Sequence, residues 1–327
     1  MTAAAPFAEI WRGPFLESVH SGHAVICDEA GQIVQAWGDP DLVVLPRSSS
    51  KMLQALPLVR SGAADAFNLT TRQLALACAS HQGAEIHVDS VGAWMAQLGL
   101  NDDDFRCGPE ESRDRSVKEA QIRAHESPCR IHNNCSGKHA GFLTLTKHLG
   151  AGPDYTDPGH AVQRACLEAF EEATQETSPG HGIDGCSAPN FAATLHGIAR
   201  AMAHFAAAPD GSAEQRLHQA MRLHPDLVAG EGRACTELMR ATDGKVALKT
   251  GAEGFFIAIL PDQKLGIALK AACGTTRAAE AAITALLVRL GALDANHPAT
   301  LKRINAPIKN WDGLVTGTLK PAANLLA

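Results

Sequence analysis

Apolar positions along the chain follow two different periods. Residues 15–39 hold two apolar-rich runs joined by the turn-forming segment DEAGQ at 28–32, which predicts a β-hairpin. Short apolar runs return at 245–250, 254–260 and 265–273, the last two joined by a second turn signal, PDQK. Residues 276–293 predict a C-terminal helix, whereas the tail from Asn296 is weakly patterned.

Between these strands the apolar period is that of an α-helix. Residues recur every three or four positions, and Gly or Pro separates most of the segments. The predicted helices cover 51–62, 88–100, 116–125, 139–150, 161–175 and 190–208.

The order of strands, helices, strands and helix predicts the fold class. Parallel α/β folds alternate strand and helix throughout, and this chain does not. We therefore expect an α/β protein of the α+β type, a single catalytic domain over 1–327. Its antiparallel sheet lobe would cover about 1–45 and 243–327, with a helical lobe inserted at about 46–242. A ligand cleft is expected between the two lobes.

Composition narrows the function classes. Apolar residues make up 45% and charged residues 20% of the chain, the balance of a soluble globular protein. The net charge of -6, with no clustering of basic residues, gives no support for binding nucleic acid or an anionic membrane. The first residues lack the pattern of a signal peptide, and no apolar run is long enough to span a bilayer, so we expect a cytoplasmic protein. Most of the nine cysteines should then be free thiols.

A Ser-x-x-Lys motif, Ser48 to Lys51, stands where the chain enters the first predicted helix. Residues three apart share a face of a helix, so a neutral Lys51 amine could take the Ser48 proton and activate that serine. Such chemistry requires the pKa of Lys51 to be lowered by burial or by a nearby cation such as Arg47. The alternative is a capping serine followed by a solvated lysine.

Two further stretches suggest catalytic side chains. In ALACASHQGAE, residues 75–85, an apolar run stops at Ser80, which could serve as a second hydroxyl and proton relay. In KVALKTGAEGFF, residues 245–256, Lys249 ends a strand beside Gly251, which permits the close approach of a substrate. The alternatives are a helix end closed at Gly83 and a surface lysine at a hairpin.

Two cysteines lie in polar, Gly-rich segments. Cys135 belongs to HNNCSGKHAG, residues 132–141, and Cys186 belongs to GIDGCSAPN, residues 182–190. Such settings suit reactive or metal-ligating thiols, although two unrelated turns would give the same pattern. Neither segment has the CxxC or HExxH spacing of a common zinc site.

Taken together, Ser-x-x-Lys, the isolated serine and Lys-Thr-Gly resemble the motifs of serine β-lactamases, penicillin-binding proteins and serine-type glutaminases. The whole chain more specifically resembles the rhizobial-type bacterial asparaginase II family. The runs that carry this resemblance lie between residues 46 and 254; they are PRSSSKMLQALPL, ACASHQG, NNCSGKHAGFL, DGCSAPNFA and KTGAEG. The chain has no Ser-Asp-Asn run, which weighs against lactam hydrolysis.

The resemblance implies a homodimeric hydrolase with a β-lactamase-like fold that converts L-asparagine to L-aspartate and ammonia. It implies two serine-lysine pairs, Ser48 with Lys51 and Ser80 with Lys249, although Lys264 and Lys270 also lie on late strands.

The same resemblance implies a metal, usually zinc, that aids substrate orientation and is not essential to bond breaking. Its ligands would be Cys135, Lys138 and Cys186, with Asp184 close by. Asp184, His139 and Arg47 are the expected substrate-binding residues, and the Arg47 guanidinium suits a carboxylate.

In the mechanism we expect, Ser48 attacks the side-chain amide carbon of asparagine while Ser80 and Lys249 relay a proton to the leaving ammonia. Exchanging the roles of Ser48 and Ser80 is an open alternative. Competing functions are a serine-type glutaminase, a β-lactamase or penicillin-binding-like hydrolase, and a non-enzymatic metal-binding or penicillin-sensing domain.

Overall fold

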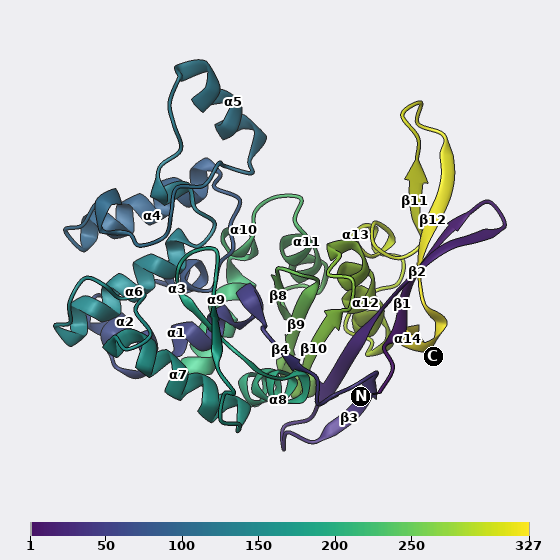
Figure 1. Ribbon diagram of the computed structural model, residues 1–327, viewed down its shortest axis with the longest axis horizontal. Helices are drawn as coiled ribbons and strands as arrows, with labels where there is room; N and C mark the ends of the chain where they lie inside the picture. The colour runs from purple at the N-terminus through teal and green to yellow at the C-terminus, as the bar shows by residue number, and fades with distance from the viewer. Residues whose placement is uncertain (1, 327) are drawn as a thin grey trace. The chain divides into compact units, whose positions relative to one another are not determined.

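The structure is a computed structural model that describes residues 2–326. These residues form two compact units. The first unit holds the chain up to Ser49, the segment Ala193–Ala207 and the chain from Glu237 onward. The second unit holds Ser50–Ala192 and Ala208–Thr236. The elements of both are labelled in Figure 1.

An antiparallel sheet of eight strands forms the first unit. Its order is β11-β12-β1-β2-β10-β9-β8, and β3 also pairs with β2. The strands are β1 (Ala5–Arg12), β2 (Phe15–Cys27), β3 (Ile33–Trp37), β8 (Ala247–Gly251), β9 (Phe255–Leu260), β10 (Leu265–Ala271), β11 (Ala306–Lys309) and β12 (Val315–Pro321). The expected fold class is confirmed, because the strands near 17–38 and 245–272 share one antiparallel sheet.

Two helices cover this sheet. Helix α8 (Leu195–Ala206) lies against β2, β9 and β10, and α12 (Thr276–Arg289) lies against β1, β9, β10 and β12. Strand β9 is buried along its whole length, as its unbroken apolar sequence FFIAIL requires. On α12, Ala281 joins Ile10 and Leu319 in a buried cluster. The expected C-terminal helix therefore packs on the sheet.

Three strands of the eight-stranded sheet were not predicted. Strand β1 and the tail strands β11 and β12 extend the sheet beyond β2, and β12 pairs with β1. Gly317 and Pro321 lie within β12, and both residue types are poor strand formers, which weakens the sequence signal. Short helices α13 (Pro298–Leu301) and α14 (Ala323–Leu326) complete the tail. The 3₁₀ turn η4 (Pro261–Gln263) joins β9 to β10 at the expected hairpin.

Helix α8 falls within the segment expected to form the helical lobe, yet it belongs to the first unit. Strand β7 (Ala193–Thr194) pairs with β4 (Val43–Val44) and leads the chain back to the sheet. The helix then approaches β10 at Gly266, where a Cβ atom would lie 2.1 Å from the Ala203 nitrogen and 2.4 Å from the Ala199 carbonyl oxygen. Only glycine permits this contact between backbones.

Gly266→Ala is therefore expected to destabilise the protein by about 3 kcal/mol, because the helix backbone must move away from the strand. The measurement is urea unfolding followed by circular dichroism. Gly152→Ala is the matched control, since a Cβ there meets no atom within 4 Å. An equal unfolding midpoint for both variants would contradict this account of the packing.

The second unit is mainly helical. Its helices are α1 (Lys51–Arg60), α2 (Ala63–Ala66), α3 (Thr71–Ala77), α4 (Glu85–Gln97), α5 (Arg115–Ala124), α6 (Ser136–Leu149), α7 (Ala161–Thr174), α9 (Ala213–Leu223) and α10 (Pro225–Val228); α11 (Ala234–Ala241) crosses into the first unit. The 3₁₀ turns η2 (Asp102–Asp104) and η3 (Arg130–His132) lie between helices, and β5 (His181–Ile183) pairs with β6 (Pro189–Phe191). Over residues 2–326, no helix is long and apolar enough to cross a membrane.

Candidate active site

A buried lysine joins two candidate side chains in the second unit. Lys51 is the first residue of α1 and is only 1% exposed. Its Nζ donates hydrogen bonds to Ser80 Oγ at 2.9 Å, to Cys135 Sγ at 3.1 Å and to the carbonyl of Ala79. The amine thus lies within proton-transfer distance of a hydroxyl that can act as a nucleophile.

The capping alternative for Ser48 is wrong. The N-cap of α1 is Ser50, whose side chain makes no capping hydrogen bond, and Ser48 lies one turn earlier in the 3₁₀ turn η1 (Arg47–Ser50). This alternative also required Lys51 to be exposed to solvent, whereas Lys51 is buried.

Ser80 lies in an irregular segment that follows α3. The helix ends at Ala77, so the alternative of a helix closed at Gly83 is wrong. The backbone N–H of Ser80 donates to the carbonyl of Val228, and that of His81 donates to the carbonyl of Asn134. These two bonds tie the segment to neighbouring parts of the same unit and fix the direction of the Ser80 side chain.

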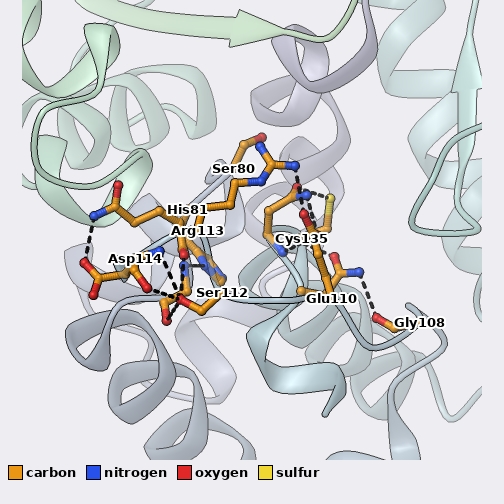
Figure 2. A network of polar contacts seen from close by, with 12 residues as sticks. Ser80, His81, Gly108, Glu110, Ser112, Arg113, Asp114 and Cys135 are labelled. Atoms are coloured by element: carbon orange, nitrogen blue, oxygen red, sulfur yellow. Dashed lines mark hydrogen bonds and ion pairs between the residues drawn. The ribbon is translucent and has the colours of Figure 1, made fainter. Parts of the chain in front are cut away.

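A polar loop, residues 108–114, fastens this segment to the one that carries Cys135 (Figure 2). The buried hydroxyl of Ser112 contacts the carbonyls of Gln82 at 3.1 Å and Gly83 at 2.9 Å. Glu110 Oε2 accepts from the backbone N–H of Asn134 at 3.0 Å and from its Nδ2 at 2.6 Å. Sequence analysis missed Glu110 and Ser112, because a polar run such as PEESRD is typical of any exposed loop.

The two predicted thiols lie together. Cys135 is the N-cap of α6, and Cys186 lies in the turn between β5 and β6, where Lys138 Nζ donates to its Sγ at 3.0 Å. A hydrogen bond from Cys135, together with Lys138 and His139, lowers the pKa of Cys186 well below its usual range. The same hydrogen bond with Cys186, together with burial, raises the pKa of Cys135. All nine cysteines are free thiols, as expected, which excludes a Cys135–Cys186 disulfide.

His139 lies in the core beside this thiol pair. Its Nδ1 is 2.8 Å from the Tyr155 hydroxyl, and its ring packs edge-to-face with the rings of Phe142 and Tyr155. Burial lowers the pKa of His139, although contact with Cys186 opposes the shift, so the ring is neutral at pH 7. Its Nε2 is buried without a hydrogen-bond partner.

The first unit contains the remaining predicted residues. The turn that carries Ser48 packs on the end of β8: Ser49 Oγ donates to the Lys249 carbonyl at 3.0 Å, and a Cβ on Gly251 would lie 2.6 Å from the Pro46 oxygen. Arg47 in the same turn has a φ of 54°, in the left-handed region. Such a strained conformation at a non-glycine residue is compatible with a functional role for this turn.

Lys249 is 1% exposed, so the alternative of a surface lysine is wrong. Its Nζ donates to the Thr250 carbonyl at 2.9 Å. The other two lysines on late strands differ, because Lys264 is exposed in an ion pair with Glu29 and Lys270 donates to the Glu253 and Ala271 carbonyls. Burial therefore favours Lys249 over Lys264 as the second interior lysine.

The geometry can be compared with known proteins. Residues 8–321 match the family described as L-asparaginase II. The chain belongs to the L-asparaginase II family. A comparison with curated proteins found no match.

Solved structures with a similar fold include a β-lactamase from Mycobacterium bovis, at 13% identity and a TM-score of 0.45, covering 79% of this chain and 89% of that chain. Mglu in its native form is similar at 14% identity and a TM-score of 0.48, covering 86% of this chain and 66% of that chain. A penicillin-binding protein homologue from Caulobacter crescentus is similar at 14% identity and a TM-score of 0.37, covering 79% of this chain and 90% of that chain.

Family membership makes the protein an L-asparaginase-type amidohydrolase. Of the predicted residues, Lys51, Ser80, Cys135, Lys138, His139, Asp184 and Cys186 lie in the second unit and Arg47, Ser48 and Lys249 lie in the first. Asp184 lies in the β5–β6 turn, where its carboxylate accepts from the Gly185 N–H and helps to raise the pKa of Lys138.

The residues of the thiol pair suit a metal ion in their chemistry. Thiolate sulfur and imidazole nitrogen are preferred zinc ligands, and the unpartnered Nε2 of His139 adds to Cys135 and Cys186. Over residues 2–326, no group of three or more His, Cys, Asp or Glu side chains is arranged to hold a metal. A metal here would therefore depend on Lys138 as a ligand, or on movement of His139.

Proposed function

We propose that the protein hydrolyses L-asparagine to L-aspartate and ammonia by means of a serine hydroxyl that Lys51 deprotonates. The observation that carries the proposal is the 2.9 Å contact between Lys51 Nζ and Ser80 Oγ, made where the lysine is shielded from water. This contact supports Ser80 as the nucleophile. Ser48, the nucleophile expected from sequence, remains the second candidate.

In this mechanism Lys51 is the neutral amine, so the hydrogen bond with Ser80 is reversed and the hydroxyl donates to Nζ. The amine then takes the Ser80 proton as the Oγ atom attacks the side-chain amide carbon of asparagine. The C–N bond then breaks, and the Lys51 ammonium returns a proton to the leaving ammonia. Water, deprotonated by the same amine, cleaves the aspartyl-serine ester. The Ser80 backbone N–H cannot stabilise the oxyanion, since it already donates to Val228. Ser48 and Lys249 stay predicted participants in proton transfer, and Arg47, Asp184 and His139 stay predicted substrate-binding residues.

A zinc ion would be held by Cys135, Cys186 and Lys138, where it would act as a Lewis acid that orients the substrate. The proposal is supported by the donor set and by the lowered pKa of Cys186, because metal ligands must be deprotonated. Lys138 must lose a proton to bind metal. Burial favours this loss, but the two cysteines outweigh burial and raise its pKa.

If zinc binds here, protein prepared with zinc should carry it, and Cys135→Ala should lose most of it. Removal of the metal should raise KM more than it lowers kcat, because the ion orients the substrate without breaking the bond. Elemental analysis of wild type, Cys135→Ala and the control Cys166→Ala, a buried thiol bonded to the Gln54 carbonyl, measures this directly. Equal zinc in Cys135→Ala and wild type, or none in either, removes the metal from the account.

The substrate is tested by ammonia release from asparagine and glutamine, in parallel with nitrocefin turnover. We expect asparagine to give the largest kcat/KM. Preference for glutamine would show that the protein is a glutaminase. Turnover of nitrocefin would show a β-lactamase-like hydrolase, and inactivity on all three compounds would show a binding domain. A homodimer is also proposed from the family resemblance, and sedimentation equilibrium measures the oligomeric state. A cytoplasmic location stays a prediction.

A further inference from the structure

A groove lies between α4 and α5, and none of its lining residues belongs to the cluster of Lys51, Ser80 and Cys135. Its volume is about 730 Å³, within the range of small-molecule sites. Apolar side chains of both helices line it, including Val88 and Val117, and no residue of α5 is buried. Figure 1 shows α5 standing apart from the other helices of its unit. The groove therefore has a mixed lining, in which apolar side chains lie among polar and acidic ones, and α5 does not fill it.

A thiol, an imidazole and an amide line this groove. Cys129 Sγ lies 3.2 Å from His132 Nδ1, and Gln121 Nε2 lies 3.0 Å from His132 Nε2. The Cys129 backbone N–H also donates to His132 Nδ1, at 3.2 Å, so Nδ1 is the unprotonated ring nitrogen and the proton sits on Nε2. A half-turn of the Gln121 amide presents its oxygen to that proton. A nucleophile, its base and an orienting group are thus in the order that activates a thiol.

Helix capping explains only part of this arrangement. Cys129 is the N-cap of η3, and His132 accepts the N–H of that position, as in a capping box. Capping does not require the Sγ contact, the Gln121 contact or the open groove. Burial, reinforced by the carboxylate of Asp102, raises the pKa of the Cys129 thiol. The thiol therefore keeps its proton until a base removes it, and the His132 imidazole lies 3.2 Å from its sulfur.

We propose that Cys129, with His132 as its base, is a covalent attachment site for small disulfides that are cationic or neutral. The Cys129 proton passes to His132 Nδ1, the thiolate attacks one sulfur of the disulfide, and the S–S bond breaks. The departing thiolate takes the proton from His132 and leaves as a free thiol. Atoms and electrons balance, since the disulfide is the oxidant and one of its halves stays on Cys129.

Charge selects this class of disulfide. The groove is lined by the carboxylates of Glu85, Asp89 and Glu126. The cations of α5 are engaged elsewhere: Arg115 and Arg123 pair with Glu119, and Lys118 pairs with Glu111. The negative lining attracts a cationic reagent and repels an anionic one.

The test uses the full chain, freshly reduced and then mixed with cystamine, a cationic disulfide, or with dithiodipropionate, an anionic one. Peptide mapping follows the rate at each cysteine, and Cys273, the exposed thiol, is the internal reference. With cystamine we expect Cys129 to react faster than Cys273. We also expect Cys129 to favour cystamine over dithiodipropionate by about ten-fold, the low end of such steering.

His132→Gln keeps a polar side chain at the cap but removes the base. It should slow Cys129 about 100-fold, the low end for a positioned base, and leave Cys273 unchanged. If this variant melts early, Gln121→Leu replaces it, with a smaller loss of rate expected. Equal rates at Cys129 and Cys273, or no loss of rate in the variant that folds, would overturn the proposal. Neither result depends on the asparagine reaction.

Discussion

Lys51→Met is expected to lower kcat for asparagine hydrolysis by about 10³-fold, within the range of a positioned general base. Methionine keeps most of the volume of the buried stem but cannot take the Ser80 proton. The same change removes the donor to Cys135 and to the Ala79 carbonyl, so some loss of stability is also expected. Steady-state ammonia release at 25 °C measures kcat, and a thermal melt measures the fraction folded.

Lys118→Met is the matched control. Lys118 lies on α5 of the same unit, half-exposed in an ion pair with Glu111, and such pairs contribute little. Its kcat should stay at the wild-type value. A folded Lys51→Met that retains most of the activity would show that the contact with Ser80 serves only the fold.

Ser80→Ala is expected to lower kcat by about 10⁴-fold or more, as loss of a nucleophile does in serine hydrolases. Ser48→Ala should lose less, about 10²-fold, because the hydroxyl would act in proton transfer. Both changes are small in volume and should leave the melting temperature within a few degrees of wild type. The measurement is single-turnover hydrolysis of asparagine by both variants. The reverse order of the two losses would make Ser48 the nucleophile and Ser80 the relay.

Strand pairing near both ends of the chain was predictable, because short apolar runs and turn residues mark β2, β3, β9 and β10. Strand β12 was not, since it carries Gly317 and Pro321. Helix α8 was predicted as a helix. Its place on the sheet depends on Gly266, a single residue 60 positions or more from the helix in sequence.

The site residues were predicted better than their pairing. The argument for Ser48 with Lys51 assumed one α-helix through both, whereas the helix begins at Lys51. The contact of Lys51 with Ser80 joins residues 29 apart, and no local pattern records it. Cys135 and Cys186 were identified by their polar neighbours, yet both are buried, and Lys51 from α1 and Lys138 from α6 donate hydrogen bonds to them. Glu110 and Ser112 carry no sequence signal beyond that of a loop.

The central claim is that a serine next to Lys51 forms a covalent bond with the substrate. A diazoketone analogue of asparagine alkylates the nucleophile of an amidohydrolase, and peptide mapping then identifies the modified residue. The account predicts one label on Ser80 in the wild-type protein, protection by asparagine, and loss of the label in Lys51→Met. A label on Ser48 would contradict the choice of nucleophile, and a label on Cys135 or Cys186, or on none of these residues, would contradict serine-lysine catalysis itself.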